Sequence, residues 1–131
     1  MQKSINIFTP DKITLPLSWV GYIPFAAWLV EILHPQILVE LGTHSGNLYF
    51  AFCQTVKKNQ LLTKCYTVDT WKEAQHSGIY DNNVYNEILA YNSTIYGDFS
   101  QLFCMTFDEA LTKFENGSID LLHINGEYTY Q

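Results

Sequence analysis

Apolar residues along this chain follow two rhythms, one typical of buried strands and the other of amphipathic helices. Four short runs rich in aliphatic and aromatic residues are expected as strands, at 37–41, 64–70, 102–106 and 119–125. Before and between them, apolar residues return every three or four positions, which predicts helices over 24–33, 47–58, 84–96 and 108–114. Strand and helix therefore alternate, and this order predicts an α/β protein built from right-handed βαβ units on a parallel sheet.

The helical periodicity also predicts which side chains face the core. The expected inward stripes, helix by helix, are Phe25, Trp28, Leu29 and Ile32; Tyr49, Phe52, Cys53 and Val56; Val84, Ile88, Tyr91 and Ile95; and Phe107, Ala110, Leu111 and Phe114. Residues 1–18 contain two prolines and little periodicity, so we expect an irregular arm before a single domain over 19–131. Residues 71–83 are polar and are expected as a loop.

The composition fits one globular domain with no footprint for nucleic acid or membrane. The 131 residues are 47% hydrophobic and carry a formal net charge of -6, and no basic run exceeds the pair Lys57-Lys58. The longest apolar stretch, residues 19–33, is too short to span a bilayer, and the first residues lack the basic-then-apolar order typical of a signal peptide. We therefore expect a cytoplasmic protein that binds neither nucleic acid nor membrane.

The cysteines and histidines give no sign of a metal centre. Cys53, Cys65 and Cys104 are odd in number, widely spaced and set in apolar runs, which favours buried, reduced thiols. No zinc-ligand spacing occurs, so no metal site is expected. His34 is expected at a helix terminus and His123 as a buried strand residue.

The first predicted strand runs directly into a turn bounded by two glycines, Gly42 and Gly46. Gly42 allows the sharp exit from the strand, and Gly46 allows the backbone to approach a ligand or a neighbouring strand closely. The following helix points its first N–H groups and the positive end of its dipole at the turn. The pattern is acid-x-Gly-x-x-x-Gly, and His44 occupies the middle position of the nicotinamide fingerprint, which disfavours a nicotinamide enzyme.

Ligands of parallel α/β sheets bind beyond the carboxyl ends of the strands, so the residue after each strand is informative. Asp69 ends the second strand, 27 residues after Gly42, close to the spacing of about 20 at which an acid takes a ribose hydroxyl. A carboxylate accepts two hydrogen bonds from a vicinal diol better than a neutral side chain does. The alternative is an acid that caps the loop that follows it.

The other strand ends supply aromatic and polar candidates. Trp71 is placed to lie flat on a purine or to be part of the core. Thr106 and Phe107 are placed to edge an adenine pocket, or Thr106 caps the next helix. Asn125 and Tyr128 follow the fourth strand and are expected to face the same crevice.

Segments covering most of the chain resemble class I S-adenosylmethionine-dependent methyltransferases, in particular the subgroup associated with bacterial glycosyltransferases. These segments are PLSWVGYIPFAAWLVEILHP, ILVELGTHSGNLYFAFCQ, CYTVDTWK and MTFDEALTKFENGSIDLLHINGEYTY. The resemblance implies a Rossmann-like parallel sheet of order 3-2-1-4, with helices on both faces and S-adenosylmethionine as cofactor. It also implies that Glu40, Gly42 and Gly46 cradle the methionine part, that Asp69 holds the ribose, and that Thr106 and Phe107 line the adenine. Their neighbours Thr43, His44, Thr70 and Trp71 are further cofactor-binding candidates.

The fourth strand departs from the family pattern. The subgroup has His-Ile-Asp-Gly-x-His-x-Tyr there, whereas Asn125 replaces the acid and Tyr128 replaces the histidine in this chain. In related O-methyltransferases that acid helps to hold a divalent metal, and an amide is a weaker ligand for a hard cation. Neither replacement is a base near neutral pH. Asn125, Glu127 and Tyr128 are therefore candidates without an assigned catalytic role.

The family fold normally continues through three more strands, so we expect the chain to form the N-terminal half of that fold, as a fragment or a short form. Two functions follow. One is an S-adenosylmethionine-dependent methyltransferase domain that acts on a sugar or glycan intermediate, with little catalysis in this short form. The other is a catalytically inactive binding or assembly module. The open edge of the fourth strand, residues 119–124, predicts a homodimer. The alternative is a monomer in which the N-terminal arm (residues 1–18) or the C-terminal tail folds over that edge.

Overall fold

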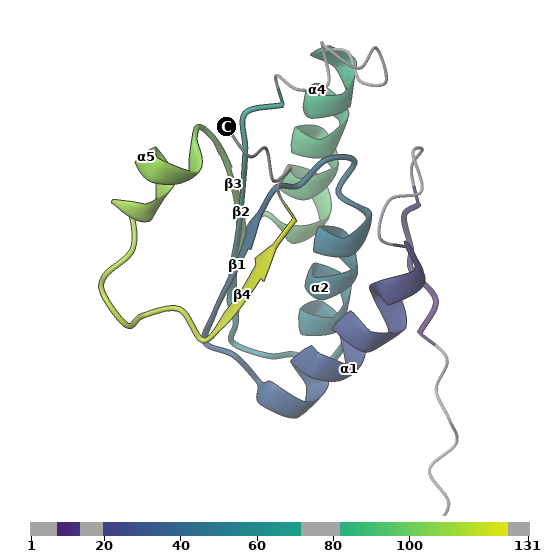
Figure 1. The fold of residues 1–131 in the computed structure, drawn as a ribbon. Helices are drawn as coiled ribbons and strands as arrows, with labels where there is room; N and C mark the ends of the chain where they lie inside the picture. The colour runs from purple at the N-terminus through teal and green to yellow at the C-terminus, as the bar shows by residue number, and fades with distance from the viewer. Residues whose placement is uncertain (1–7, 14–19, 72–81, 126–131) are drawn as a thin grey trace, which may run out of the picture.

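Four parallel strands form the centre of the molecule, in the order β3-β2-β1-β4 that was predicted (Figure 1). The computed structural model describes residues 8–13, 20–71 and 82–125. The strands are β1 (Ile37–Leu41), β2 (Lys64–Asp69), β3 (Ser100–Cys104) and β4 (Leu121–Ile124). β3 begins two residues before its predicted range, and β4 is shorter than predicted at both ends. β1 lies between β2 and β4, so its carboxyl end is at the middle of the sheet.

Helices cover both faces of the sheet, and the two faces are unequal (Figure 1). On one face lie η1 (Val20–Tyr22), α1 (Ile23–Leu33), α2 (Asn47–Lys58), α4 (Asn82–Tyr91) and η2 (Asn92–Tyr96). The other face carries α5 (Phe107–Leu111). The expected loop over 71–83 ends earlier than predicted, because α4 begins at residue 82, and residues 72–81 lie outside the described part of the chain.

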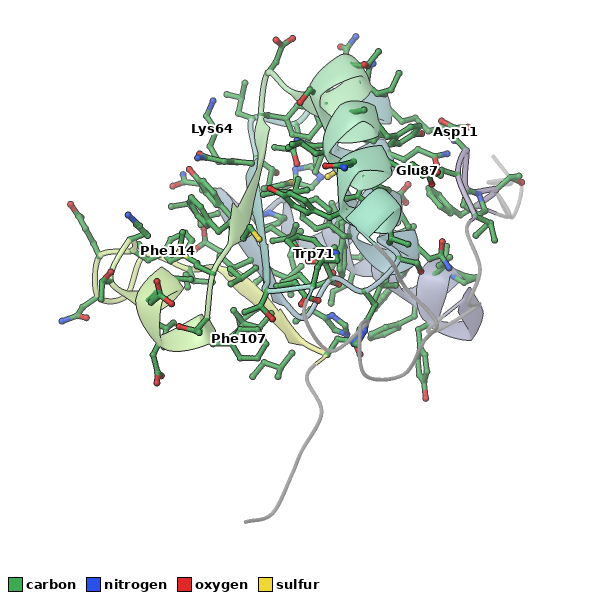
Figure 2. The ribbon with its side chains drawn as sticks, turned by 90° about the horizontal axis from the view of Figure 1, so that it is seen from above. Asp11, Lys64, Trp71, Glu87, Phe107 and Phe114 are labelled. Carbon is green, nitrogen blue, oxygen red and sulfur yellow. The ribbon has the colours of Figure 1, made fainter. Side chains whose placement is uncertain are left out.

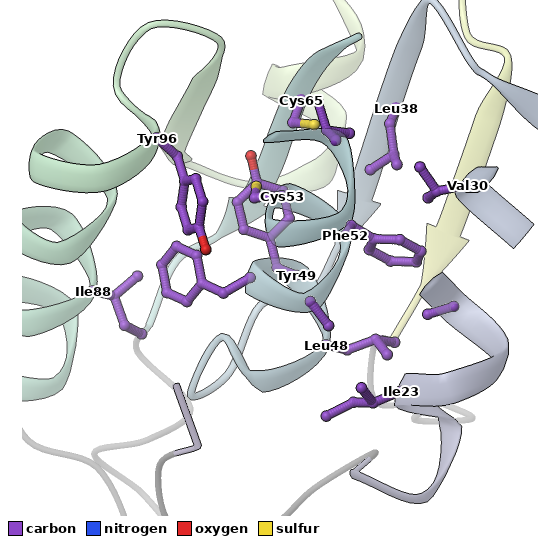
Figure 3. Close-up of a cluster of buried hydrophobic side chains, with 14 of the residues drawn as sticks. Ile23, Val30, Leu38, Leu48, Tyr49, Phe52, Cys53, Cys65, Ile88 and Tyr96 are labelled. Atoms are coloured by element: carbon purple, nitrogen blue, oxygen red, sulfur yellow. The ribbon is translucent and has the colours of Figure 1, made fainter. Parts of the chain in front are cut away.

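Helix α2 is the centre of the larger core (Figure 3). The predicted inward stripe is confirmed, because Tyr49, Phe52, Cys53 and Val56 are all buried. Most of the opposite side of α2 is buried as well, since Ile23 and Val30 of α1 flank it on one side and Ile88 and Tyr96 on the other. The helix that leaves the glycine turn is therefore held on several sides.

Helix α1 turns a different face to the core than its periodicity predicts. Phe25, Trp28 and Ile32 are 58%, 53% and 61% exposed, so the prediction that they point inward is wrong, and Leu29 is half-buried. The buried face consists of Ile23, Ala26, Ala27 and Val30. Small side chains let α1 approach α2 closely, and a helix that is apolar nearly all round offers two faces that satisfy the same period.

The predicted third helix changes its winding before it ends. Ile88 is buried as predicted, whereas Ile95 is 38% exposed and Tyr96 is 1% exposed. The cause is the π-helical η2, in which each turn holds more residues than an α-helical turn. The inward positions therefore shift along the chain by one residue, and the prediction for Ile95 is wrong.

Two smaller corrections concern the face that carries α5 and the edge strand β3. Leu111 is 50% exposed rather than inward, because α5 ends at this residue and Phe114 reaches the core from the turn that follows. Cys104 is exposed at the end of β3, which lies at an edge of the sheet, whereas Cys53 and Cys65 are buried as predicted.

Residues 8–13 of the expected arm lie against α2 and α4. The amide nitrogen of Asp11 donates to Oε1 of Gln54 at 2.7 Å, and Nε2 of Gln54 donates to the carbonyl oxygen of Thr9 at 2.8 Å. The ammonium of Lys12 lies 5.0 Å from the ring centroid of Tyr91. Among the helices of the described residues, none is long and apolar enough to cross a membrane.

Candidate functional site

The turn from Gly42 to Gly46 connects the end of β1 to the first turn of α2. The amide of Gly42 donates to the carbonyl oxygen of Val68 at 2.7 Å, which extends the pairing of β1 with β2 into the turn. Gly42 and Gly46 have φ values of 94° and 85°, the left-handed region that favours glycine. A Cβ on Gly46 would lie 2.8 Å from Cε2 of Phe50, so the turn also depends on close contact with the helix.

The carboxylate of Asp69 holds this turn from the neighbouring strand. Its Oδ2 accepts hydrogen bonds from the backbone N–H groups of Thr43 at 2.9 Å and His44 at 3.1 Å. Its Oδ1 accepts from the N–H of Trp71 at 2.8 Å. The structure thus brings Asp69 to the glycine turn and also makes it a cap for its own loop. A carboxylate oxygen has two lone pairs, so acceptor capacity for a further donor is present.

Of the two roles predicted for Trp71, contact with a purine or burial in the core, the structure shows burial in the core. Its side chain is 9% exposed, and its Nε1 donates to the carbonyl oxygen of His44 at 3.1 Å. Its ring packs against that of Tyr85, with centroids 4.6 Å apart. Figure 2 shows Trp71 in the interior of the molecule. Thr70, beside it in the chain, is half-buried.

A buried acid lies directly below the turn. Glu40 is fully buried on β1, and the strand register places Thr67 of β2 and His123 of β4 on either side of it. Its Oε2 lies 3.0 Å from Nδ1 of His123, whose side chain is 22% exposed. Burial raises the pKa of Glu40, and the hydrogen bond and charge of His123 oppose that rise. Thr67 contacts both Glu40 and the hydroxyl of Thr43 in the turn.

The sequence pattern did not identify the pair of Glu40 with His123, because His123 was expected only as a buried strand residue. A signal for it existed. Glu40 lies two residues before Gly42, and His123 lies two residues before Asn125, so strands that end together place the two side chains opposite each other. Finding the pair required both the strand order and the register.

Asn125 reaches the turn from the end of β4. Its N–H donates to the carbonyl oxygen of Leu41 at 2.7 Å, and its own carbonyl oxygen lies 3.1 Å from Nε2 of His44. Since a carbonyl oxygen only accepts, Nε2 of His44 carries the proton in this contact. The structure therefore brings His44 and Asn125 together, while the other two candidates after this strand, Glu127 and Tyr128, lie outside the described residues.

The end of β3 joins the same edge of the sheet, because the N–H of Met105 donates to the carbonyl oxygen of Asp69 at 3.1 Å. Thr106 forms a capping box with Glu109 at the start of α5. Of the two roles predicted for Thr106, the structure therefore shows the helix cap. Phe107 is half-buried in the smaller core, and Figure 2 shows it with Phe114 on the α5 side of the molecule.

Hydrogen-bond donors of the backbone and acidic side chains lie together at one end of the sheet. The backbone N–H groups and helix terminus of the turn suit an anionic group, and the acids Glu40 and Asp69 suit a cation or hydroxyl donors. Among the residues that the structure describes, no group of three or more His, Cys, Asp or Glu side chains is arranged to hold a metal ion.

The sheet order and the glycine turn define a Rossmann-like α/β protein. Residues 39–131 match the model of a family described as a methyltransferase domain, and the chain belongs to this family. A curated relative, the y4gI protein of Sinorhizobium fredii (strain NBRC 101917 / NGR234), is 45% identical over 113 residues. That match covers 86% of this chain and 12% of the relative, so the chain spans only a small part of the longer protein.

Solved protein structures share the fold. The S-adenosylhomocysteine-bound methyltransferase PaMTH1 of Podospora anserina superposes with a TM-score of 0.60 at 17% identity, over 88% of this chain and 43% of that one. The cofactor-bound protein Rv0187 from MTB gives a TM-score of 0.58 at 15% identity, over 88% of this chain and 47% of that one. The chain thus spans less than half of each of these structures.

Proposed function

We propose that this chain is an S-adenosylmethionine-binding methyltransferase domain whose cofactor lies on the Gly42–Gly46 turn. The observation that carries the proposal is the reach of Asp69 from β2 to the N–H groups of Thr43 and His44. This contact places the glycine turn and the acid of the next strand at one site, as a nucleoside with an attached amino acid requires. The S-adenosylhomocysteine bound by PaMTH1 and the family match support it.

The proposed placement assigns each part of the cofactor to a group of matching chemistry. The methionine carboxylate faces the N-terminus of α2 at the glycine turn, and the ammonium lies toward the anionic side chain of Glu40. The ribose hydroxyls donate to Asp69, and the adenine lies beside Thr106 and Phe107 at the end of β3. The cofactor supplies an activated methyl group, and the residues of this chain bind and orient it.

We further propose a sugar or glycan intermediate as the acceptor in the full-length protein, on the basis of the sequence resemblance. The competing function is a binding or assembly module without methyl transfer. It is favoured by Asn125, a neutral amide where the family resemblance implies an acid. In either case we propose a second copy of the chain as a partner, in contact along the open edge of β4.

Calorimetric titration with S-adenosylhomocysteine tests the cofactor assignment. Asp69→Ala removes the acceptor of the ribose hydroxyls and the support of the turn, so we expect binding weaker by roughly 1–3 kcal/mol. Asp120→Ala is a matched control, because its Oδ2 also accepts two backbone N–H groups, from Gln36 at 2.9 Å and Ile37 at 3.1 Å, at the opposite end of β1.

The control variant should bind like the wild type, since it disturbs β1 away from the turn. Two results would contradict the assignment: no binding by the wild type at millimolar ligand, or equal affinity of the wild type and Asp69→Ala. Methyl transfer by the chain to a glycan acceptor would rule out the competing function.

A further inference from the structure

The contact between Glu40 and His123 joins two strands at the centre of the sheet, below the glycine turn. Oε2 of Glu40 lies 3.0 Å from Nδ1 of His123, and the hydroxyl of Thr67 lies 3.5 Å from Oε1. Glu40 itself is 0% exposed. His123 therefore provides the short side-chain hydrogen bond to a carboxylate that is shielded from water.

A buried carboxylate stays charged only when hydrogen bonds or opposite charges replace the lost water. The side chains that act electrostatically on Glu40 come from three neighbouring elements: His123 of β4, His44 of the turn and Asp69 of β2. The charge of Asp69 opposes ionisation, and the two histidines favour it. Phe52 of α2, with its ring centroid 6.0 Å from that of His123, contributes no charge.

We propose that His123 is a positioning residue that keeps Glu40 anionic below the glycine turn, so that the negative charge favours the ammonium group of an amino-acid ligand at this site. This rests on the function proposed above and names the residue that sets the charge in the methionine part of that site. His123 needs no contact with the ligand for this role, because it acts through Glu40.

The role predicts a specific change with pH. Without His123, Glu40 loses its short hydrogen bond, so burial raises its pKa further and the carboxylate becomes protonated at a higher pH than in the wild type. Affinity for an ammonium-bearing ligand should then be low at acidic pH and recover as the pH rises. In the wild type, Nδ1–H of His123 donates to the carboxylate whether the imidazole is charged or neutral, so affinity should change less.

The test compares two ligands that share an adenosine part. S-adenosylhomocysteine carries the ammonium and carboxylate, and methylthioadenosine lacks both. For His123→Phe we expect binding of S-adenosylhomocysteine to weaken about tenfold near pH 6, with a smaller loss near pH 7.5, and binding of methylthioadenosine to stay unchanged at both. Glu40→Gln should show the loss at both pH values, because its charge is absent throughout. His123→Gln, which retains an N–H donor, should bind more tightly than His123→Phe.

A measurement without ligand provides a second readout. Carbon-13 NMR of the Glu40 carboxyl should show its titration at higher pH in His123→Phe than in the wild type. Leu122→Phe is the matched control, since it places the same ring one residue away at a position that is 44% exposed, and it should leave that titration unchanged.

The outcomes separate the two proposals. If neither ligand binds to the wild type, the proposed function fails, and the role of His123 fails with it. If methylthioadenosine binds and His123→Phe holds S-adenosylhomocysteine as tightly as the wild type at both pH values, the role of His123 alone is overturned. An unchanged carboxyl titration in His123→Phe would overturn it as well. The expected pH profile with the shifted titration supports it.

Discussion

Gly46 combines two requirements that only glycine meets together. Its φ of 85° lies in the left-handed region, and a Cβ there would come within 2.8 Å of the ring of Phe50. Gly117 shares the first requirement, with φ of 73°, and has nothing within 4 Å of an added Cβ. A comparison of substitutions at Gly46 and Gly117 therefore separates the effect of backbone strain from the effect of steric contact.

We expect Gly46→Ala to lower the free energy of unfolding by about 2–4 kcal/mol, from left-handed strain plus overpacking against Phe50. Gly117→Ala should cost about 1–2 kcal/mol, because it adds the strain alone. Urea denaturation of both variants measures the difference. Equal losses would show that the contact with Phe50 contributes nothing. We also expect Phe50→Leu to restore part of the lost stability in the Gly46→Ala background, because it removes the ring that the new Cβ meets. No recovery would contradict a role for this contact.

Some residues of the candidate site could be predicted from the sequence and others could not. Gly42, Gly46 and Asp69 could be predicted because their signal is spacing along the chain, and the structure brings all three to one turn. The pair of Glu40 with His123 could not be predicted in the same way, because it depends on the register between strands 83 residues apart. Whether Asp69 binds a ribose stays a prediction, since its contacts in the free chain are with the backbone.

The helices show why periodicity identifies an element more reliably than its buried face. The glycine turn, the helix start at Asn47 and the stripe of α2 were all predicted, because α2 has polar residues only at its ends and in a few positions. In α1 large aromatic residues form the regular stripe, yet small residues form the packed face. In η2 the wider π-helical turn shifts the inward-facing positions by one residue, and no local sequence pattern predicts that shift.

The reversed face of α1 leads to a direct comparison of two substitutions. Val30 is 0% exposed and Ile32 is 61% exposed, although the stripe predicted from sequence contains Ile32 and omits Val30. We expect Val30→Ala to destabilise by about 1–3 kcal/mol through a cavity between α1 and α2. Ile32→Ala, which removes a larger side chain, should change stability by less than about 0.5 kcal/mol. Chemical denaturation at low protein concentration measures both, and the reverse ranking would contradict the packing of α1.

The exposed side of α1 and the edge strand β4 form one continuous apolar region. An apolar groove of about 260 Å³ lies between them and is lined by Tyr22, Phe25, Ala26, Leu29, Leu48, Phe52, Leu121, Leu122 and His123. On the α5 side of the sheet, Leu122 and Ile124 are 44% and 47% exposed. Residues 8–13, the described part of the arm, lie against α2 and α4 and leave this edge open.

Among the described strands, β4 pairs only with β1, so its other edge presents backbone N–H and C=O groups that can pair with another chain. A second β4, related by a two-fold axis perpendicular to the sheet, satisfies those groups and covers the apolar side chains on both faces. This symmetry keeps each face on its own side, and in the register with His123 opposite its own copy, Leu122 lies opposite Ile124. We therefore expect light scattering at micromolar concentration to give twice the mass of one chain.

Substitution of both Leu122 and Ile124 by lysine should give a monomer, because each chain would bury two charges in the contact. Leu62→Lys, at a position that is 95% exposed, should leave the dimer intact, and a wild type with the mass of one chain would rule out the dimer.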